Sequence, residues 1–123
     1  MKKFILICTI MLGVLPALFA DAAEDAQFKQ YVERSQKSPT NPPGMIITAD
    51  PTYRIVYVTM PIAASKSNID AARIAVMKQA MIDTMRNMKE DLRVIKSLNI
   101  STVYTFITVD KYLISIPISH QEF

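Results

Sequence analysis

The hydrophobic pattern is most regular between Ile69 and Leu98, a stretch that contains neither glycine nor proline. Its apolar residues recur every three or four positions: Ile74, Met77, Met81, Met85, Met88, Leu92 and Ile95. Charged residues fill the opposite side: Arg73, Asp83, Arg86, Lys89, Glu90, Arg93 and Lys96. This spacing predicts one long amphipathic α-helix. Ser67, followed three residues later by Asp70, is a carboxylate version of the capping box and predicts the start of this helix.

The segment after this helix is rich in β-branched and aromatic residues, which predicts two strands joined by a turn at Asp110 and Lys111. A two-residue turn would pair the following residues on one face: Val109 with Tyr112, Ile107 with Ile114, Thr105 with Ile116, and Val103 with Ile118. This face is apolar except at Thr105 and is predicted to face the core. The reverse face would carry Tyr104, Phe106, Thr108, Leu113, Ser115 and Pro117.

The chain before the long helix predicts a helix over 23–35, a proline-rich linker over 35–44, and strands over 45–49 and 53–60. Together these elements predict an α+β fold. It would consist of a small, mostly antiparallel sheet of three to four strands packed on one long amphipathic helix, with a short N-terminal helix.

The N-terminus has the pattern of an export signal. Met1–Lys3 is basic, Phe4–Phe19 is nearly all apolar, and small residues follow. Cleavage after Ala22 fits the small-residue rule best, and cleavage after Ala20 is the competing choice. The apolar run is shorter than the roughly 20 residues of a membrane-spanning helix, which disfavours an uncleaved anchor. We therefore expect residues 1–22 to be a cleaved signal peptide and residues 23–123 to be a single small domain, located in the periplasm or outside the cell.

Removal of the signal leaves a nearly neutral domain. The chain has 14 Lys and Arg, of which Lys2 and Lys3 would be lost, and 11 Asp and Glu, of which Asp21 would be lost. The mature domain would then carry 12 positive and 10 negative side chains, a net charge of about +2. This balance does not resemble the concentrated basic patch of a nucleic-acid-binding protein, so we expect no nucleic-acid partner.

Several catalytic chemistries lack their residues in the mature chain, which has one histidine (His120), one glycine (Gly44) and no cysteine. Nucleophilic triads, Cys/His zinc sites and glycine-rich phosphate loops are disfavoured for this reason, and we expect no enzyme activity and no cofactor. A hydrolase based on paired carboxylates is a less favoured alternative, and the following acidic residues could serve it: Asp50, Asp70, Asp83, Glu90, Asp91 and Asp110.

Met77, Met81, Met85 and Met88 form a row along the long helix. Thioether sulfur is a soft ligand that binds Cu(I), so a methionine-rich copper site is one interpretation. The favoured interpretation is core packing, because methionine fills irregular apolar space and further apolar residues continue the same stripe.

The apolar surface exceeds what so small a sheet could cover. A helix of about thirty residues would span ~45 Å, and strands of seven to nine residues would span about 23–30 Å. The overhang, together with the reverse face of the last hairpin, predicts an interaction surface for a protein partner or for self-association. Its expected residues are Tyr104, Phe106, Leu113, Leu92 and Ile95. A membrane-surface or lipid-binding protein is an alternative, weakened by the mixed charges on the polar side of the helix. The alternative to an exposed interaction surface is that the N-terminal helix and the linker cover all these apolar residues.

Overall fold

The computed structural model describes residues 22–123, which form a four-stranded sheet and three α-helices. The predicted α+β class with a small sheet is confirmed. A helix over 22–36, here called the N-terminal helix, comes first. The remaining elements are β1 (Ile46–Asp50), β2 (Ile55–Pro61), the 3-10 turn η1 (Lys66–Asn68), α2 (Ala71–Asn87), α3 (Lys89–Leu98), β3 (Ser101–Ile107), β4 (Leu113–Ile118) and the 3-10 turn η2 (His120–Glu122). The predicted signal peptide lies outside the described residues except for Ala22. No helix of the described part is long and apolar enough to cross a membrane.

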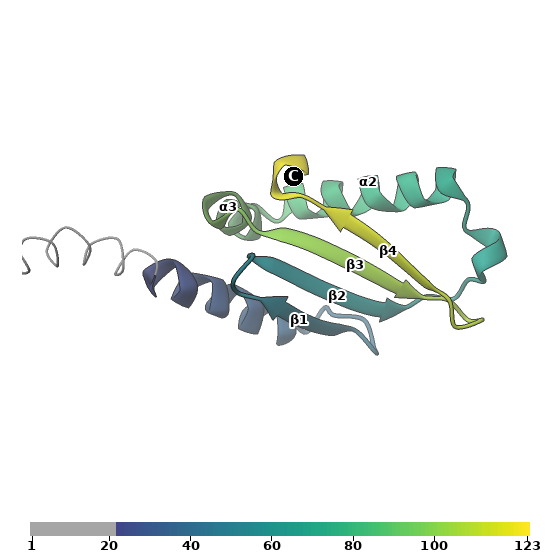
Figure 1. Cartoon of the computed structure of the whole chain (residues 1–123), viewed down its shortest axis with the longest axis horizontal. Helices are drawn as coiled ribbons and strands as arrows, with labels where there is room; N and C mark the ends of the chain where they lie inside the picture. The colour runs from purple at the N-terminus through teal and green to yellow at the C-terminus, as the bar shows by residue number, and fades with distance from the viewer. Residues whose placement is uncertain (1–21) are drawn as a thin grey trace, which may run out of the picture.

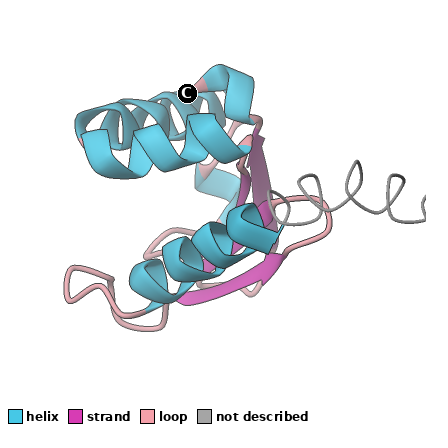
Figure 2. Cartoon of the chain, turned by 90° about the vertical axis from the view of Figure 1, so that its left-hand side faces the viewer, coloured by secondary structure: helices cyan, strands magenta, loops and turns pink. Residues whose placement is uncertain are grey.

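The strands lie in the order β1-β2-β3-β4. β1 pairs with β2, and β3 with β4, in antiparallel hairpins, whereas the central pair β2–β3 is parallel. The parallel pair requires a crossover, and α2 with α3 provides it. The crossover and the N-terminal helix lie on the same side of the sheet, as two separate groups of helices (Figures 1 and 2). We call the side that they cover the inner face of the sheet and the opposite side the outer face.

The predicted single long helix is wrong, because Met88 interrupts it. Met88 leaves the helical conformation, with φ −92° and ψ 77°, and separates α2 from α3. Figure 1 shows α3 nearly end-on while α2 runs along the sheet. The turn removes the expected overhang and lets α3 bury Ile95 and Leu98 in the core. The start of the helix was also misplaced, since Asp70 itself is the N-cap and accepts a hydrogen bond from the backbone N–H of Arg73 at 2.8 Å.

The last hairpin pairs one residue out of the predicted register. Its loop has three residues, with Lys111 in the left-handed region at φ +68°. The N–H of Lys111 donates to the carbonyl of Thr108 at 3.0 Å, and the N–H of Thr108 donates to the carbonyl of Tyr112 at 2.9 Å. This is the pattern of a type I turn followed by one left-handed residue. The partner of Ile114 is therefore Phe106, whereas the two-residue turn would pair Ile114 with Ile107.

This shift reverses the faces of β3 but leaves those of β4 as predicted. The inner-face residues of the two strands are Thr102, Tyr104, Phe106, Ile114, Ile116 and Ile118. The predicted core residues Val103, Thr105 and Ile107 lie on the outer face, together with the exposed Leu113. The core then joins the inner face to the N-terminal helix through Phe28, Tyr31 and Val32, and to the crossover through Ile82, Ile95 and Leu98.

The end of the chain is held against α2. Phe123 is buried, and Glu122 forms an ion pair with Lys78 (Nζ–Oε1 2.5 Å). Glu122 also accepts a hydrogen bond from the backbone N–H of Ser119 at 2.8 Å, which completes a capping box in η2. The Lys78 ammonium and this N–H lower the pKa of the Glu122 carboxyl below its ordinary value.

The lowered pKa predicts an acid-sensitive contribution to stability. The contribution of Glu122 is fully present above the unfolded-state pKa of a glutamate, about 4.3, and is lost as the pH falls through the lower folded-state pKa. Urea unfolding should therefore show wild type to be more stable than Glu122→Gln at pH 6, and the difference should narrow at pH 3. A difference that is the same at both pH values would contradict this assignment.

Candidate binding groove

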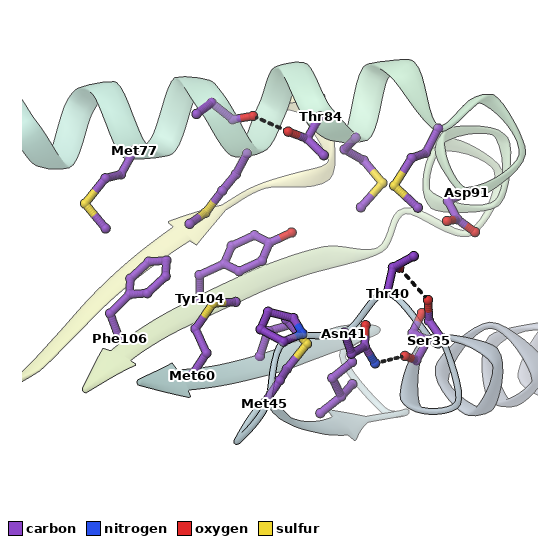
Figure 3. Close-up of a pocket in the computed structure, with 18 of the residues that line it drawn as sticks. Ser35, Thr40, Asn41, Met45, Met60, Met77, Thr84, Asp91, Tyr104 and Phe106 are labelled. Carbon is purple, nitrogen blue, oxygen red and sulfur yellow. Dashed lines mark hydrogen bonds between the residues drawn. The ribbon is translucent and has the colours of Figure 1, made fainter. Parts of the chain in front are cut away.

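A groove of about 650 Å³ lies between α2, the linker and the inner face of the sheet (Figure 3). Its floor comes from alternate residues of three adjacent strands: Ile47 of β1, Val58 and Met60 of β2, and Tyr104 and Phe106 of β3. Alternate residues of a strand point to one face, and the pairing of Val58 with Tyr104 and of Met60 with Phe106 aligns the two central strands. The observed register thus places both aromatic residues on the floor.

The α2 side of the groove follows from helical spacing. Residues three and four apart share one helix face, and the residues of α2 and its C-cap that line the groove are Met77, Ala80, Met81, Thr84, Met85 and Met88. The predicted apolar stripe is therefore only partly used for closed packing. Met77, Met81 and Met85 are half-buried against the core, and Met88 is 46% exposed.

The linker forms the remaining side and is ordered. The side-chain amide of Asn41 donates to the carbonyl of Ser35 at 2.7 Å, and Ser38 and Thr40 share a hydrogen bond between their hydroxyls at 2.9 Å. Gly44 has φ +81°, a conformation that favours glycine, and leads the chain into β1. This local network holds Met45 and Pro42 at the edge of the groove.

All six methionines within residues 22–123 line this one groove. Four are the row on α2 that the sequence singled out, and the other two are Met45 and Met60. Methionine has an unbranched, polarizable side chain that adapts its shape to different apolar molecules, and it is common at promiscuous binding surfaces. The groove therefore has a soft apolar wall rather than a rigid one.

The two ends of the groove differ in polarity. Figure 3 shows Met77 and Phe106 at one end and Ser35, Thr40 and Asp91 at the other. At the polar end, Arg34 of the N-terminal helix donates to Asp91 of α3, with 2.6 Å between Nη2 and Oδ1. These are the only ionisable acidic or basic residues among those that line the groove.

A second cavity, of about 490 Å³, lies between the N-terminal helix and α3, and we call it the arginine cleft. It is lined by Gln27, Gln30, Tyr31, Arg34, Arg93, Val94 and Ser97. It has two arginines and no acidic residue in this lining, and Arg34 lines the groove as well. Tyr31 is buried in its wall, and burial, followed by the nearby Asp91 carboxylate, raises the pKa of the phenol.

The five residues of the predicted interaction surface do not form one surface. Ile95 and Phe106 are 0% and 3% exposed, so they belong to the core. Tyr104 and Leu92 are half-buried on the helix-covered side, whereas Leu113 is exposed on the outer face. The prediction failed because it relied on the two-residue turn and on an unbroken helix.

The acidic residues considered for catalysis have structural partners. Asp50 accepts hydrogen bonds from two backbone N–H groups of its own turn, and Asp110 accepts one from the N–H of Lys66. Asp70 caps α2, and Asp91 pairs with Arg34. Asp83 accepts from Gln79, and Glu90 from Arg93, both within one helix.

The remaining candidates for a chemical site are the single histidine and a metal-binding cluster of side chains. The backbone N–H of His120, in η2, donates to the hydroxyl of Ser101 at 3.3 Å. No group of three or more His, Cys, Asp or Glu side chains that could hold a metal ion occurs within residues 22–123. The groove is therefore the candidate site that the geometry defines best.

Comparisons of this chain with protein-family models, with curated proteins and with solved structures found no match.

Proposed function

We propose that this is a small exported, non-enzymatic binding protein of the periplasm or the extracellular space, and that it holds an apolar ligand in the methionine-lined groove. The observation that carries the proposal is the gathering of all six methionines of residues 22–123 around one groove.

The size and lining of the groove support a binding role. Sites for small molecules are typically about 300–1,000 Å³, mostly apolar, with a few polar groups that fix orientation. The groove is of this size, most of its helix side and floor is methionine, aromatic and aliphatic, and its two charged residues, Arg34 and Asp91, lie at one end. An apolar ligand would bury this surface, which is the main favourable term in such binding.

Three other interpretations are less well supported. The prediction of a protein partner or a second copy rests on an overhanging helix and on the reverse face of the last hairpin. The break at Met88 removes the first reason, and of that face Phe106 is buried while Leu113 is exposed. A Cu(I) site on Met77, Met81, Met85 and Met88 would use the same groove, but most of the floor beneath it (Ile47, Val58 and Phe106) offers no metal ligand. A carboxylate hydrolase would need acidic residues that already serve caps, turns and ion pairs.

Filling the groove tests the proposal. Ala80 lines the groove and is exposed, so a larger side chain there can extend over the groove without displacing the core. The measurement is a fluorescence titration of the purified protein with an apolar dye such as N-phenyl-1-naphthylamine. Wild type should bind the dye saturably, and Ala80→Trp should weaken binding by about tenfold or more, a difference of ~1.4 kcal/mol.

Ala75→Trp is the matched control, because Ala75 is exposed on the same helix but does not line the groove. Ala75→Trp changes the helix propensity as Ala80→Trp does, and it should bind the dye as wild type does. The chain has no tryptophan of its own, so each variant also reports its own environment. Emission from Ala80→Trp should be blue-shifted relative to Ala75→Trp. Equal dye binding in all three proteins, or no saturable binding in any, would contradict the proposal.

A further inference from the structure

We propose that the ligand is a single-chain amphiphile with a phosphate head group, whose acyl chain lies in the methionine-lined groove and whose phosphate lies in the arginine cleft. This inference rests on the proposed function and adds the chemical class of the ligand. Its starting observation is that the two cavities meet at one residue, Arg34, which lines both.

The arginine cleft has the charge and the donors that a phosphate needs. Arg34 and Arg93 line it from opposite helices, and their carboxylate partners, Asp91 and Glu90, lie outside that lining. Gln27, Gln30 and Ser97 add neutral hydrogen-bonding groups. Guanidinium groups present planar forks that bind phosphate oxygens bidentately, which favours an anionic head group over a neutral or cationic one.

The existing ion pairs leave these arginines available. A guanidinium has five N–H donors, and within residues 22–123 the Arg34 side chain donates only to Asp91. Arg93 pairs with Glu90 on its own helix at 3.2 Å, and both side chains are about three-quarters exposed. An exposed pair of this kind contributes little, so a phosphate can replace Glu90 at small cost. The Asp91 side chain is only 18% exposed, so Arg34 would keep that ion pair and bind the phosphate through its other N–H groups.

The order of the cavities fits an amphiphile rather than a wholly apolar molecule. From Met77 and Phe106 the lining passes to Thr40 and Ser35 at the polar end, and then, through Arg34, to the arginine cleft. A wholly apolar ligand would leave the N–H donors of Arg34 and Arg93 unused. An apolar peptide would have to bury its backbone amide groups against the thioether and hydrocarbon side chains of the groove. The combined site therefore matches one hydrocarbon chain joined to one anion.

The test compares two lipids that differ only in the phosphate: 1-palmitoylglycerol 3-phosphate and 1-palmitoylglycerol. Both are used below their critical micelle concentrations, as competitors of the apolar dye on the full-length purified protein. Wild type should bind the phosphate lipid about tenfold more tightly than the neutral lipid. Arg93→Gln should remove most of this preference, because Arg93 lines the arginine cleft.

Lys96→Gln is the matched control: it removes the same charge from an exposed position of α3 that lines neither cavity. It should preserve the preference for the phosphate lipid. Equal affinity of wild type for the two lipids, or equal effects of the two substitutions, would overturn the head-group inference. Saturable dye binding in the same experiments would still support the groove as a ligand site. Displacement of the dye by an apolar peptide and by neither lipid would also overturn the head-group inference. Absence of dye binding would overturn the proposed function itself.

Discussion

Phe106→Ala is expected to lower the free energy of unfolding by about 3–5 kcal/mol, the usual cost of removing a buried phenylalanine side chain. Phe106 is 3% exposed on the inner face of β3. Its neighbour Ile107 is half-buried on the outer face and is not part of the core cluster, so Ile107→Ala should cost about 1 kcal/mol or less. Urea unfolding of the two variants beside wild type measures both values.

The pair of substitutions decides the register of the last hairpin. A two-residue turn at Asp110 and Lys111 would place Ile107 in the core and Phe106 outside, and the order of the two costs would then be reversed. The three-residue loop gives the order stated above. Since the aromatic floor of the groove depends on this register, a reversed order would also remove the floor of the proposed site.

Phe123→Ala is expected to have an effect of similar size, about 3–5 kcal/mol, although Phe123 is a terminal residue. Terminal residues are often frayed, but Phe123 is 5% exposed and belongs to the core cluster. Chemical unfolding of the purified variant measures the loss. It should appear as a lower midpoint with little change in the denaturant dependence of the free energy.

Gln121→Ala is the control for this substitution, because Gln121 is exposed in the same short 3-10 turn. Its unfolding should stay within about 0.5 kcal/mol of wild type. If Phe123→Ala were as mild as Gln121→Ala, the C-terminal turn would not be packed on the crossover helices α2 and α3, and the ion pair between Glu122 and Lys78 would not be held in place.

Local sequence patterns were sufficient to predict the helices and strands but not the helix break and the turn that connect them. The N-terminal helix, the four strands and the helical character of 71–98 follow from composition and periodicity. The break at Met88 has no glycine or proline, and the three- and four-residue spacing of apolar residues continues across it, so the pattern predicts an unbroken helix there. One signal was present: Glu90 and Asp91 stand in the first turn of α3, where the helix dipole favours acidic side chains.

The hairpin error has a similar physical cause. A type I′ hairpin turn requires left-handed conformations at both central residues, which glycine, asparagine and aspartate supply; Asp110 fits this preference but Lys111 does not. The three-residue loop needs only one such position, and Lys111 accepts it. Consideration of the turn chemistry would have favoured the longer loop and placed Phe106 inside.

The site could be predicted only in part. The row on α2 was visible as a methionine stripe, but Met45 and Met60 joined it through the fold. The parallel pairing of β2 with β3 places the crossover over the same face as the linker, and no local pattern encodes that pairing. The arginine cleft likewise combines the N-terminal helix with α3, two segments that only the tertiary structure brings together.

The most direct test of the central claim is NMR of the protein labelled at the methionine, isoleucine and leucine methyl groups, titrated with an apolar ligand. Since all six methionines of residues 22–123 line the groove, they are six reporters on one site. We predict that most of their resonances shift together and saturate with a single dissociation constant. Methionine signals that stay unchanged, while outer-face residues such as Ile46 and Leu113 respond, would contradict a ligand site in the groove.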